Sequence, residues 1–156
     1  MVEMTGVLNP RGAWVADRCS IAKALDVVRT RSAFLILREA FYGTTRFADF
    51  AERADISEPV AAARVRELVE HGLLELGDYR EPGQRTRREY RLTRKGEELF
   101  PVLAALMLWG DRWENDGGRV ELCHRDCGEP VEVALRCAAG HELGPSDLEL
   151  ARKSKA

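Results

Sequence analysis

The amino-acid sequence predicts a mainly helical α+β fold: a winged helix-turn-helix with a C-terminal dimerisation helix and a small β-hairpin or ribbon tail. Three observations support this prediction. Amphipathic helical segments come first, two alternating segments then flank an arginine-rich loop, and a long apolar helix follows. We therefore divide the 156 residues into an N-terminal arm (1–16), a main domain (17–115) and a Cys/His-containing extension (116–156).

The N-terminal arm reads as loose because glycine and proline interrupt it. A first helix is expected over residues 20–28, where apolar side chains recur on one face. A second is expected over residues 32–42, with Ser32 as its N-cap and Gly43 as its stop. This second helix is apolar on nearly all sides, so we expect it to be the buried centre of the fold.

The next segment is typical of a helix-turn-helix. Its first helix starts near Thr45, and Ala54 and Asp55 make the turn. The second helix is expected to begin after Ser57 as N-cap and to stop at Gly72. The residues predicted to face the core from this second helix are Ala61, Val65 and Leu68.

The opposite face of that second helix is predicted to contact DNA. Small residues there permit close approach to base edges and thymine methyl groups, and an arginine can reach guanine or phosphate. The alternative is a short alanine-rich helix favoured only by helix propensity. The residues assigned to DNA contact on this helix are Ser57, Pro59, Ala62, Ala63, Arg64 and Arg66.

Residues 73–79 and 89–93 alternate as strands and are expected to pair as a β-hairpin wing. The formal net charge of the chain is −2, but Arg80 to Lys95 holds seven Lys or Arg residues against two acids, a local charge of +5. A charge run is often only a solvated face, but its place after a helix-turn-helix favours contact with the DNA backbone or minor groove. The wing residues assigned to DNA are Arg85, Arg87 and Arg88.

A long helix is expected after Gly96, with apolar residues at steps of three and four. Such a stripe on an exposed late helix is typical of a surface that packs on a partner helix. Packing within its own domain is the alternative. The residues predicted to form a dimer interface are Leu99, Leu103, Leu106, Trp109 and Trp113.

Seven short pieces follow one another in a specific order: Cys19-Ser20-Ile21-Ala22, Leu35-Ile36-Leu37-Arg38, Arg46-Phe47, Ile56-Ser57, Arg64-Val65-Arg66-Glu67-Leu68, Gly72-Leu73 and Tyr90-Arg91-Leu92-Thr93. From Cys19 to Trp113 the chain resembles the HxlR-type winged-helix transcription regulators, relatives of the MarR group. The resemblance implies a homodimer, held by terminal helices, that reads a pseudo-palindromic operator in double-stranded DNA. Ser20 stands where the family has Pro, and Ala61 stands where it has Leu.

Cys19 lies immediately before the first expected helix. Some members of the resembling family use a Cys at this place to sense oxidants, quinones or other electrophiles. A helix N-terminus favours the thiolate form of a cysteine, which makes Cys19 the redox-sensing candidate. The alternative is a small buried thiol of the core.

The other three cysteines lie in the extension, in the spacings Cys-x3-Cys and Cys-x3-His. A strand is expected over residues 131–135 between these two pairs. Two such pairs can hold Zn²⁺ tetrahedrally on a small ribbon. The alternatives are a plain hairpin with free thiols or a disulfide. The predicted metal ligands are Cys123, Cys127, Cys137 and His141, with His124 as a spare.

These features predict a cytoplasmic, sequence-specific DNA-binding transcription regulator, a homodimeric repressor that responds to redox or electrophile stress or to a small ligand. The alternative is a winged-helix and zinc-ribbon module that binds protein or RNA, which a wing without basic residues would favour. No apolar run approaches the roughly 18 residues that cross a bilayer, and no secretion signal opens the chain. The sequence contains no Gly-rich phosphate loop and no paired-carboxylate cleft, so we do not expect an enzyme.

Overall fold

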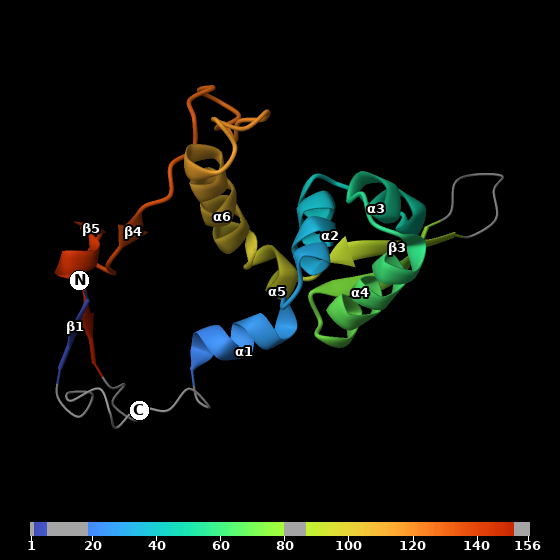
Figure 1. Cartoon of the computed structure of the whole chain (residues 1–156), viewed down its shortest axis with the longest axis horizontal. Helices are drawn as coiled ribbons and strands as arrows, with labels where there is room; N and C mark the ends of the chain where they lie inside the picture. Colours follow the sequence, from blue (N-terminus) through green and yellow to red (C-terminus); the bar gives the residue numbers. More distant parts are fainter. Residues whose placement is uncertain (1, 6–18, 80–86, 152–156) are drawn as a thin grey trace.

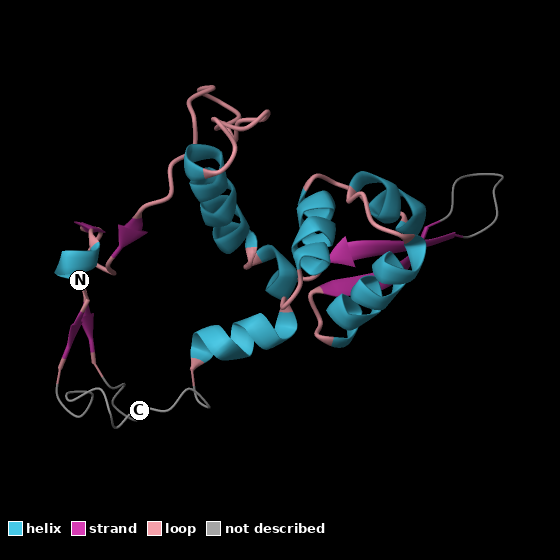
Figure 2. Cartoon of the chain, in the orientation of Figure 1, coloured by secondary structure: helices cyan, strands magenta, loops and turns pink. Residues whose placement is uncertain are grey.

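The computed structural model describes residues 2–5, 19–79 and 87–151. Figures 1 and 2 show a compact group of helices on a β-hairpin, from which a further helix and a tail extend as an open ring. The main domain comprises α1 (Ser20–Val27), α2 (Arg31–Phe41), α3 (Phe47–Arg53), α4 (Glu58–Glu70), β2 (Leu74–Tyr79), β3 (Arg87–Leu92), α5 (Arg94–Glu97) and α6 (Phe100–Trp113). The tail comprises β4 (Leu135–Arg136), β5 (Glu142–Leu143), a 3-10 turn (Pro145–Asp147) and β6 (Glu149–Leu150), which pairs with the N-terminal β1 (Glu3–Met4).

Helix α2 is the buried centre of the fold, as its apolar composition predicts. Ile36 and Leu37 are fully buried, and Phe50 of α3 and Leu68 of α4 join them in one hydrophobic cluster. The predicted N-cap, Ser32, is wrong. Thr30 caps the helix instead, because its Oγ1 accepts a hydrogen bond of 3.1 Å from the backbone N–H of Ala33.

Helices α3 and α4 form the predicted helix-turn-helix. Asp55 in the turn has φ of 51°, a left-handed conformation that Asp tolerates better than most residues. Helix α3 begins later than the predicted start near Thr45, because Arg46 occupies the N-cap position with extended backbone angles. Ser57 does occupy the N-cap position of α4, but its side chain makes no capping hydrogen bond.

Strands β2 and β3 form the predicted wing, an antiparallel pair in which Leu74 lies opposite Leu92. Thr93 joins the base of this hairpin to the helices on both sides. Its Oγ1 donates a hydrogen bond of 2.6 Å to the Gly72 carbonyl and accepts one of 3.1 Å from the Gly96 N–H. The wing therefore starts from a fixed base next to α4 and α5.

The single long helix expected after Gly96 is instead two helices, α5 and α6. Pro101 lies in the first turn of α6, where a residue without an N–H and with a fixed φ favours a helix start. The break changes which apolar side chains share a face, with consequences for the predicted dimer surface.

The tail differs most from its prediction. Residues 131–134 form no strand. The hairpin consists of the two-residue strands β4 and β5, and a single bridge joins Cys123 to Pro130. Glu3 and Met4 belong to the segment predicted as a loose arm, but they pair in parallel with β6. Local sequence patterns do not report such pairing between chain ends. No helix in the described part of the chain has the length and apolarity to cross a membrane.

Candidate nucleic-acid interface

Helix α4 rests on the core along the predicted stripe. Ala61, Val65 and Leu68 are each at most 2% exposed, and their neighbours are α2 and α3. The stripe is spaced by four and three residues, so the opposite side of the helix must face solvent. The structure therefore confirms which face of α4 is available to a ligand.

The assigned residues of α4 occupy different environments. Ser57, Pro59 and Arg66 are exposed, and Ala62 and Ala63 are half-buried. The Arg64 side chain is only 21% exposed, and its Nη1 forms an ion pair of 2.5 Å with Glu67. The two arginines assigned to DNA contact therefore differ: Arg66 points outward, whereas Arg64 is held on the flank of the helix.

A groove of about 300 Å³ lies between α4 and the wing, and Arg66 and Ala62 form part of its α4 side. Leu76 and Tyr90, which face each other across the hairpin, form part of the wing side. Side chains alternate along a strand, so Arg88 shares a sheet face with Tyr90. Arg66 and Arg88 are both exposed, so two cations flank one surface that joins helix and wing.

Arg88 is the one wing residue of the three assigned to DNA whose side chain is described. It is exposed and lies opposite Asp78 in the hairpin register. Arg85 lies outside the described residues, and only the backbone of Arg87 is described, at the start of β3. Arg91 is also exposed, but its guanidinium is paired at 2.5 Å with the mostly buried carboxylate of Glu89.

The start of α4 is acidic, which the sequence prediction did not consider. Glu52, Asp55 and Glu58 line a second groove of about 610 Å³ together with Ser57. Carboxylates repel phosphate but can accept a hydrogen bond from the amino group of cytosine. Contacts with the phosphate backbone are therefore expected from the Arg66 flank and the wing rather than from this end of the helix.

A buried polar network holds α3 against α2. Glu39 is 6% exposed, and its carboxylate accepts hydrogen bonds of 2.9 and 2.7 Å from Arg38. The Arg38 guanidinium also donates to the Arg53 carbonyl at 3.2 Å, and the Arg53 side chain donates to Thr44 at 2.9 Å. The sequence feature that could have indicated this network is Glu39, the one acidic residue of α2.

The wing is fixed to the helix-turn-helix by Tyr90. Its backbone N–H donates a hydrogen bond of 2.8 Å to the Thr45 carbonyl just before α3. Its ring meets the Phe50 ring edge to face, with centroids 6.4 Å apart. The distance between the Arg66 and Arg88 sides of the groove is therefore set by packed contacts.

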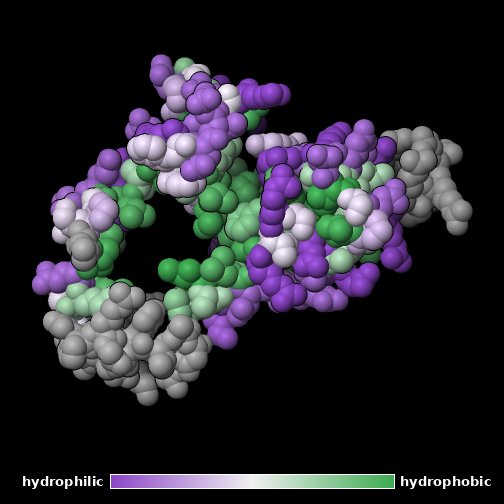
Figure 3. Space-filling model, viewed as in Figure 1, coloured by the Kyte–Doolittle hydropathy of each residue, from purple (hydrophilic) through white to green (hydrophobic). Residues whose placement is uncertain are grey.

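Helix α6 has an exposed apolar surface, but its residues are only partly those predicted. Val102, Leu106, Trp109 and Trp113 are 52–66% exposed and recur at steps of four, three and four residues. Leu99 is half-buried against the core, and Leu103 is half-buried, so neither belongs fully to the exposed stripe, whereas Val102, which was not among the predicted interface residues, is exposed. Figure 3 shows hydrophobic residues gathered on the faces of the chain between α6, α1 and the tail. Ile21 and Leu25 of α1 are also exposed.

Cys19 and the tail cysteines are distinct groups. Cys19 occupies the N-cap position of α1 and is half-buried, and its side chain makes no capping hydrogen bond. Cys123 is exposed, with its thiol 3.6 Å from the Glu121 carboxylate. Desolvation of the thiol, and then the hydrogen bond to Glu121 and the negative charge of its carboxylate, raise the pKa of Cys123 above its ordinary value.

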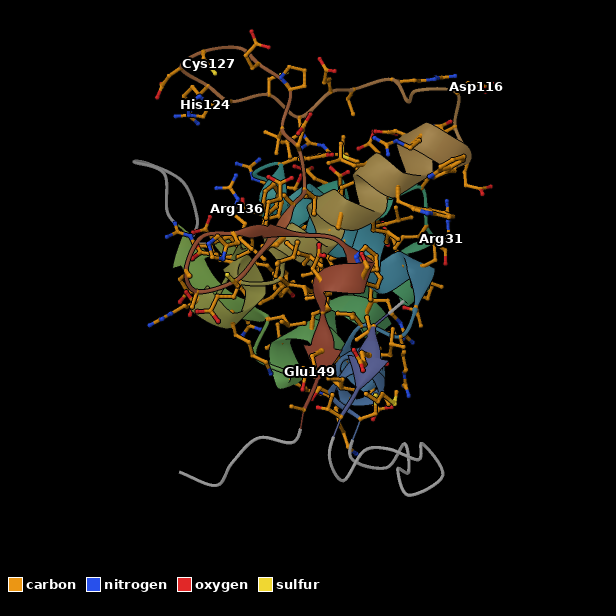
Figure 4. All side chains as sticks on the ribbon, turned by 90° about the vertical axis from the view of Figure 1, so that its left-hand side faces the viewer. Arg31, Asp116, His124, Cys127, Arg136 and Glu149 are labelled. Carbon is orange, nitrogen blue, oxygen red and sulfur yellow. The ribbon has the colours of Figure 1, made fainter. Side chains whose placement is uncertain are left out.

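The predicted set of four metal ligands is not assembled. Within residues 2–5, 19–79 and 87–151, no three His, Cys, Asp or Glu side chains group as a metal site. Instead Cys127 Sγ lies 3.1 Å from His124 Nδ1, and Cys137 Sγ lies 3.6 Å from His141 Nδ1. Figure 4 shows His124 and Cys127 together at the outer end of the tail, well away from Arg136 in β4.

Comparisons with known proteins agree on one family. The HxlR-like helix-turn-helix family matches residues 27–117. The chain is 39% identical to the HTH-type transcriptional regulator Rv3095 of Mycobacterium tuberculosis over 127 residues, 80% of this chain and 79% of the relative. It is 32% identical over 96 residues to the HTH-type transcriptional regulator sll1512 of Synechocystis, 61% of this chain and 70% of the relative.

Two solved structures have a similar fold. The crystal structure of PA1607 superposes with a TM-score of 0.78 at 36% identity, over 88% of this chain and 96% of that one. The reduced form of the transcriptional regulator YodB from B. subtilis superposes with a TM-score of 0.52 at 26% identity, over 63% of this chain and 95% of that one.

Proposed function

Because the chain belongs to the HxlR-like helix-turn-helix family, whose members are transcription regulators and not enzymes, we propose that it is a sequence-specific repressor that binds double-stranded DNA as a homodimer. The observation that carries this proposal is the pair of exposed cations, Arg66 and Arg88, on the two sides of the groove between α4 and the wing. Such a regulator acts in the cytoplasm, where prokaryotic DNA lies.

Helix α4 enters the major groove in this proposal. Arg66 donates to guanine or to an adjacent phosphate, and Ala62 is small enough to let the helix approach base edges and thymine methyl groups. Glu58, exposed at the start of the helix, is placed to accept from a cytosine amino group. Arg88 on the wing neutralises the neighbouring backbone, a contact that positions the protein without reading sequence.

The stripe of Val102, Leu106, Trp109 and Trp113 packs against a second copy of the chain. Each of these side chains leaves about half or more of its surface in water, and burying an apolar side chain fully stabilises an assembly by about 1.5–3 kcal/mol. A two-fold dimer presents two copies of α4 to half-sites about one helical turn apart, close to 34 Å. The operator is therefore expected to be a pseudo-palindrome.

Selection from a random duplex library tests this function. The expected outcome is an enriched motif with two-fold character, bound by protein that sediments as a dimer. Affinity should fall with salt with a log–log slope of about −0.9 per phosphate contact. Enrichment of no motif, or of one without two-fold character, would contradict the proposal.

Cys19 supplies a route to regulation. Its thiol lies at the start of α1, whose Ile21 and Leu25 are exposed like the residues of the α6 stripe. Oxidation or alkylation of this thiol would change the packing at that end of α1 and so the spacing of the two α4 helices. The test compares DNA affinity before and after mild oxidant in wild type and Cys19→Ser. A wild type that keeps its affinity with the thiol shown to be modified would exclude sensing through Cys19.

A further inference from the structure

The tail has no hydrophobic core of its own. In the described part of the chain, the last buried residue is Ala104. Beyond α6, apolar side chains such as Val120, Val133 and Leu135 remain 49–64% exposed. Folded segments shorter than about 40 residues usually need disulfides, a metal or a partner chain, because they cannot bury enough apolar surface. The tail therefore lacks a visible source of stability, although its backbone follows defined turns.

The first turn with metal-binding side chains holds His124 and Cys127. The backbone N–H of Gly128 donates a hydrogen bond of 2.8 Å to the His124 carbonyl, and Gly128 has φ of 77°. This conformation, which glycine adopts at low cost, ends a tight turn directly after Cys127. The turn places His124 Nδ1 and Cys127 Sγ 3.1 Å apart, so one metal ion could contact both atoms.

The second turn repeats this arrangement with Cys137 and His141. The backbone N–H of Gly140 donates a hydrogen bond of 2.9 Å to the Cys137 carbonyl, and Gly140 has φ of 88°. Cys137 Sγ and His141 Nδ1 lie 3.6 Å apart. In a tetrahedral zinc site with Zn–S near 2.3 Å and Zn–N near 2.0–2.1 Å, the S···N edge is also about 3.6 Å. The second pair therefore already has the spacing of two zinc ligands, and the first pair, at 3.1 Å, needs to open by only about 0.5 Å to reach it.

We propose that the tail binds one Zn²⁺ per chain through His124, Cys127, Cys137 and His141, with the two turns closing on the metal. This set replaces Cys123 of the sequence prediction by His124. Cys123 faces Glu121, and its backbone forms the bridge to Pro130, whereas His124 already shares a turn with Cys127. Two thiolates balance the charge of the ion, and a Cys₂His₂ set is a common composition for structural zinc.

Closure requires the two turns to approach each other, since they are separate in the structure. The segment between Cys127 and Cys137 is long enough to form a hairpin. Val131 is tied to Leu122 by a hydrogen bond of 2.7 Å, but residues 132–134 form no strand and are exposed. The free energy of metal binding would then stabilise the tail in place of a core, as in other small metal-bound domains. The site lies outside the DNA-binding surface and does not depend on the proposed function.

Titration of the reduced, metal-free full-length chain with Co²⁺, followed by competition with Zn²⁺, tests the proposal. The expected result is one Co²⁺ per chain with the absorption of a tetrahedral thiolate site, displaced by Zn²⁺. Bound Zn²⁺ should protect Cys127 and Cys137 from alkylation and leave Cys123 reactive. Absence of the tetrahedral spectrum would overturn the proposal, and so would one ion per two chains, which would place the site between copies.

Matched variants test the ligand set. His124→Ala and Cys137→Ser should weaken Co²⁺ binding by about 100-fold or more, beyond the effect of losing a supporting hydrogen bond. Cys123→Ser should bind as the wild type does. His124→Cys controls for loss of folding, because a folded tail with a cysteine at this position should still bind the ion and show stronger thiolate absorption. Loss of binding in Cys123→Ser with retention in His124→Ala would refute the assigned ligands.

Discussion

Replacement of Gly96 by alanine should loosen the junction between the wing and α5. A Cβ built at Gly96 lies 2.2 Å from the Leu73 carbonyl oxygen and 3.0 Å from Leu92 Cδ2. Contacts of a Cβ below 3.0 Å essentially do not occur, so α5 or the start of β2 must move by at least 0.8 Å. The obstructing atom belongs to the backbone, so no side-chain rotation can relieve the clash.

That movement acts on hydrogen bonds at the same place. Thr93 Oγ1 accepts from the Gly96 N–H at 3.1 Å, and the Thr93 N–H donates to the Leu73 carbonyl at 3.0 Å. Overpacking costs about 1–3 kcal/mol and a weakened hydrogen bond about 1 kcal/mol, while alanine regains about 1 kcal/mol of helix propensity. We expect Gly96→Ala to lower the free energy of unfolding by about 1–3 kcal/mol.

Urea and thermal unfolding followed by circular dichroism, at one fixed protein concentration, measure this effect. A loss of this size should lower the midpoint temperature by about 2–12 °C in a chain of this length. Gly77→Ala is the matched control, because its Cβ would meet only Glu89 Cγ, at 4.0 Å, an ordinary contact. A Gly96→Ala variant as stable as wild type, or equal destabilisation by both alanines, would refute the steric argument.

Three further experiments test the interface, the dimer and the buried network. Arg66→Ala should cost about 1–3 kcal/mol of binding and relax preference at one base position, whereas Arg88→Ala should weaken all sequences alike and flatten the salt slope; binding titrations in which both variants behave alike would reject this division. Leu106→Glu with Trp109→Glu should give monomers, and sedimentation of a still dimeric double variant would move the interface elsewhere. Glu39→Gln should lower the free energy of unfolding by about 1–3 kcal/mol, because the half-exposed Arg38 loses its charged partner and the buried network loses its charge-assisted hydrogen bonds, and unchanged denaturant midpoints would show that the network contributes nothing.

Features encoded by short-range periodicity were predictable from the sequence. The burial of α2 and the core stripe Ala61, Val65 and Leu68 follow from the spacing of apolar residues along one helix. The presence of the β2–β3 hairpin follows from two alternating segments, expected over residues 73–79 and 89–93 and observed as Leu74–Tyr79 and Arg87–Leu92. These features depend on residues a few positions apart, so the order of side chains along the chain contains the necessary information.

The missed features depend on how separate segments meet. Thr30 caps α2 in place of Ser32, a shift of the kind that makes helix ends less certain than helix centres. Leu99 packs on the core and Val102 is exposed, a difference that depends on which side of the chain meets the rest of the domain. Arg64 pairs with Glu67 while Arg66 points outward, which depends on the flank of α4 that each arginine occupies.

By itself, the sequence determined a winged helix-turn-helix with a basic wing, because helical period, turn residues and charge are properties of local order. The motifs from Cys19 to Trp113 resemble the HxlR-type regulators, and the family match over residues 27–117 confirms that family. Only the tertiary structure decided which arginines face the groove and which apolar residues of α6 remain exposed. It also decided that His124 and not Cys123 shares a turn with Cys127. The physical reason is that side-chain direction depends on backbone bends and on contacts between distant segments, and neither is visible in residue spacing alone.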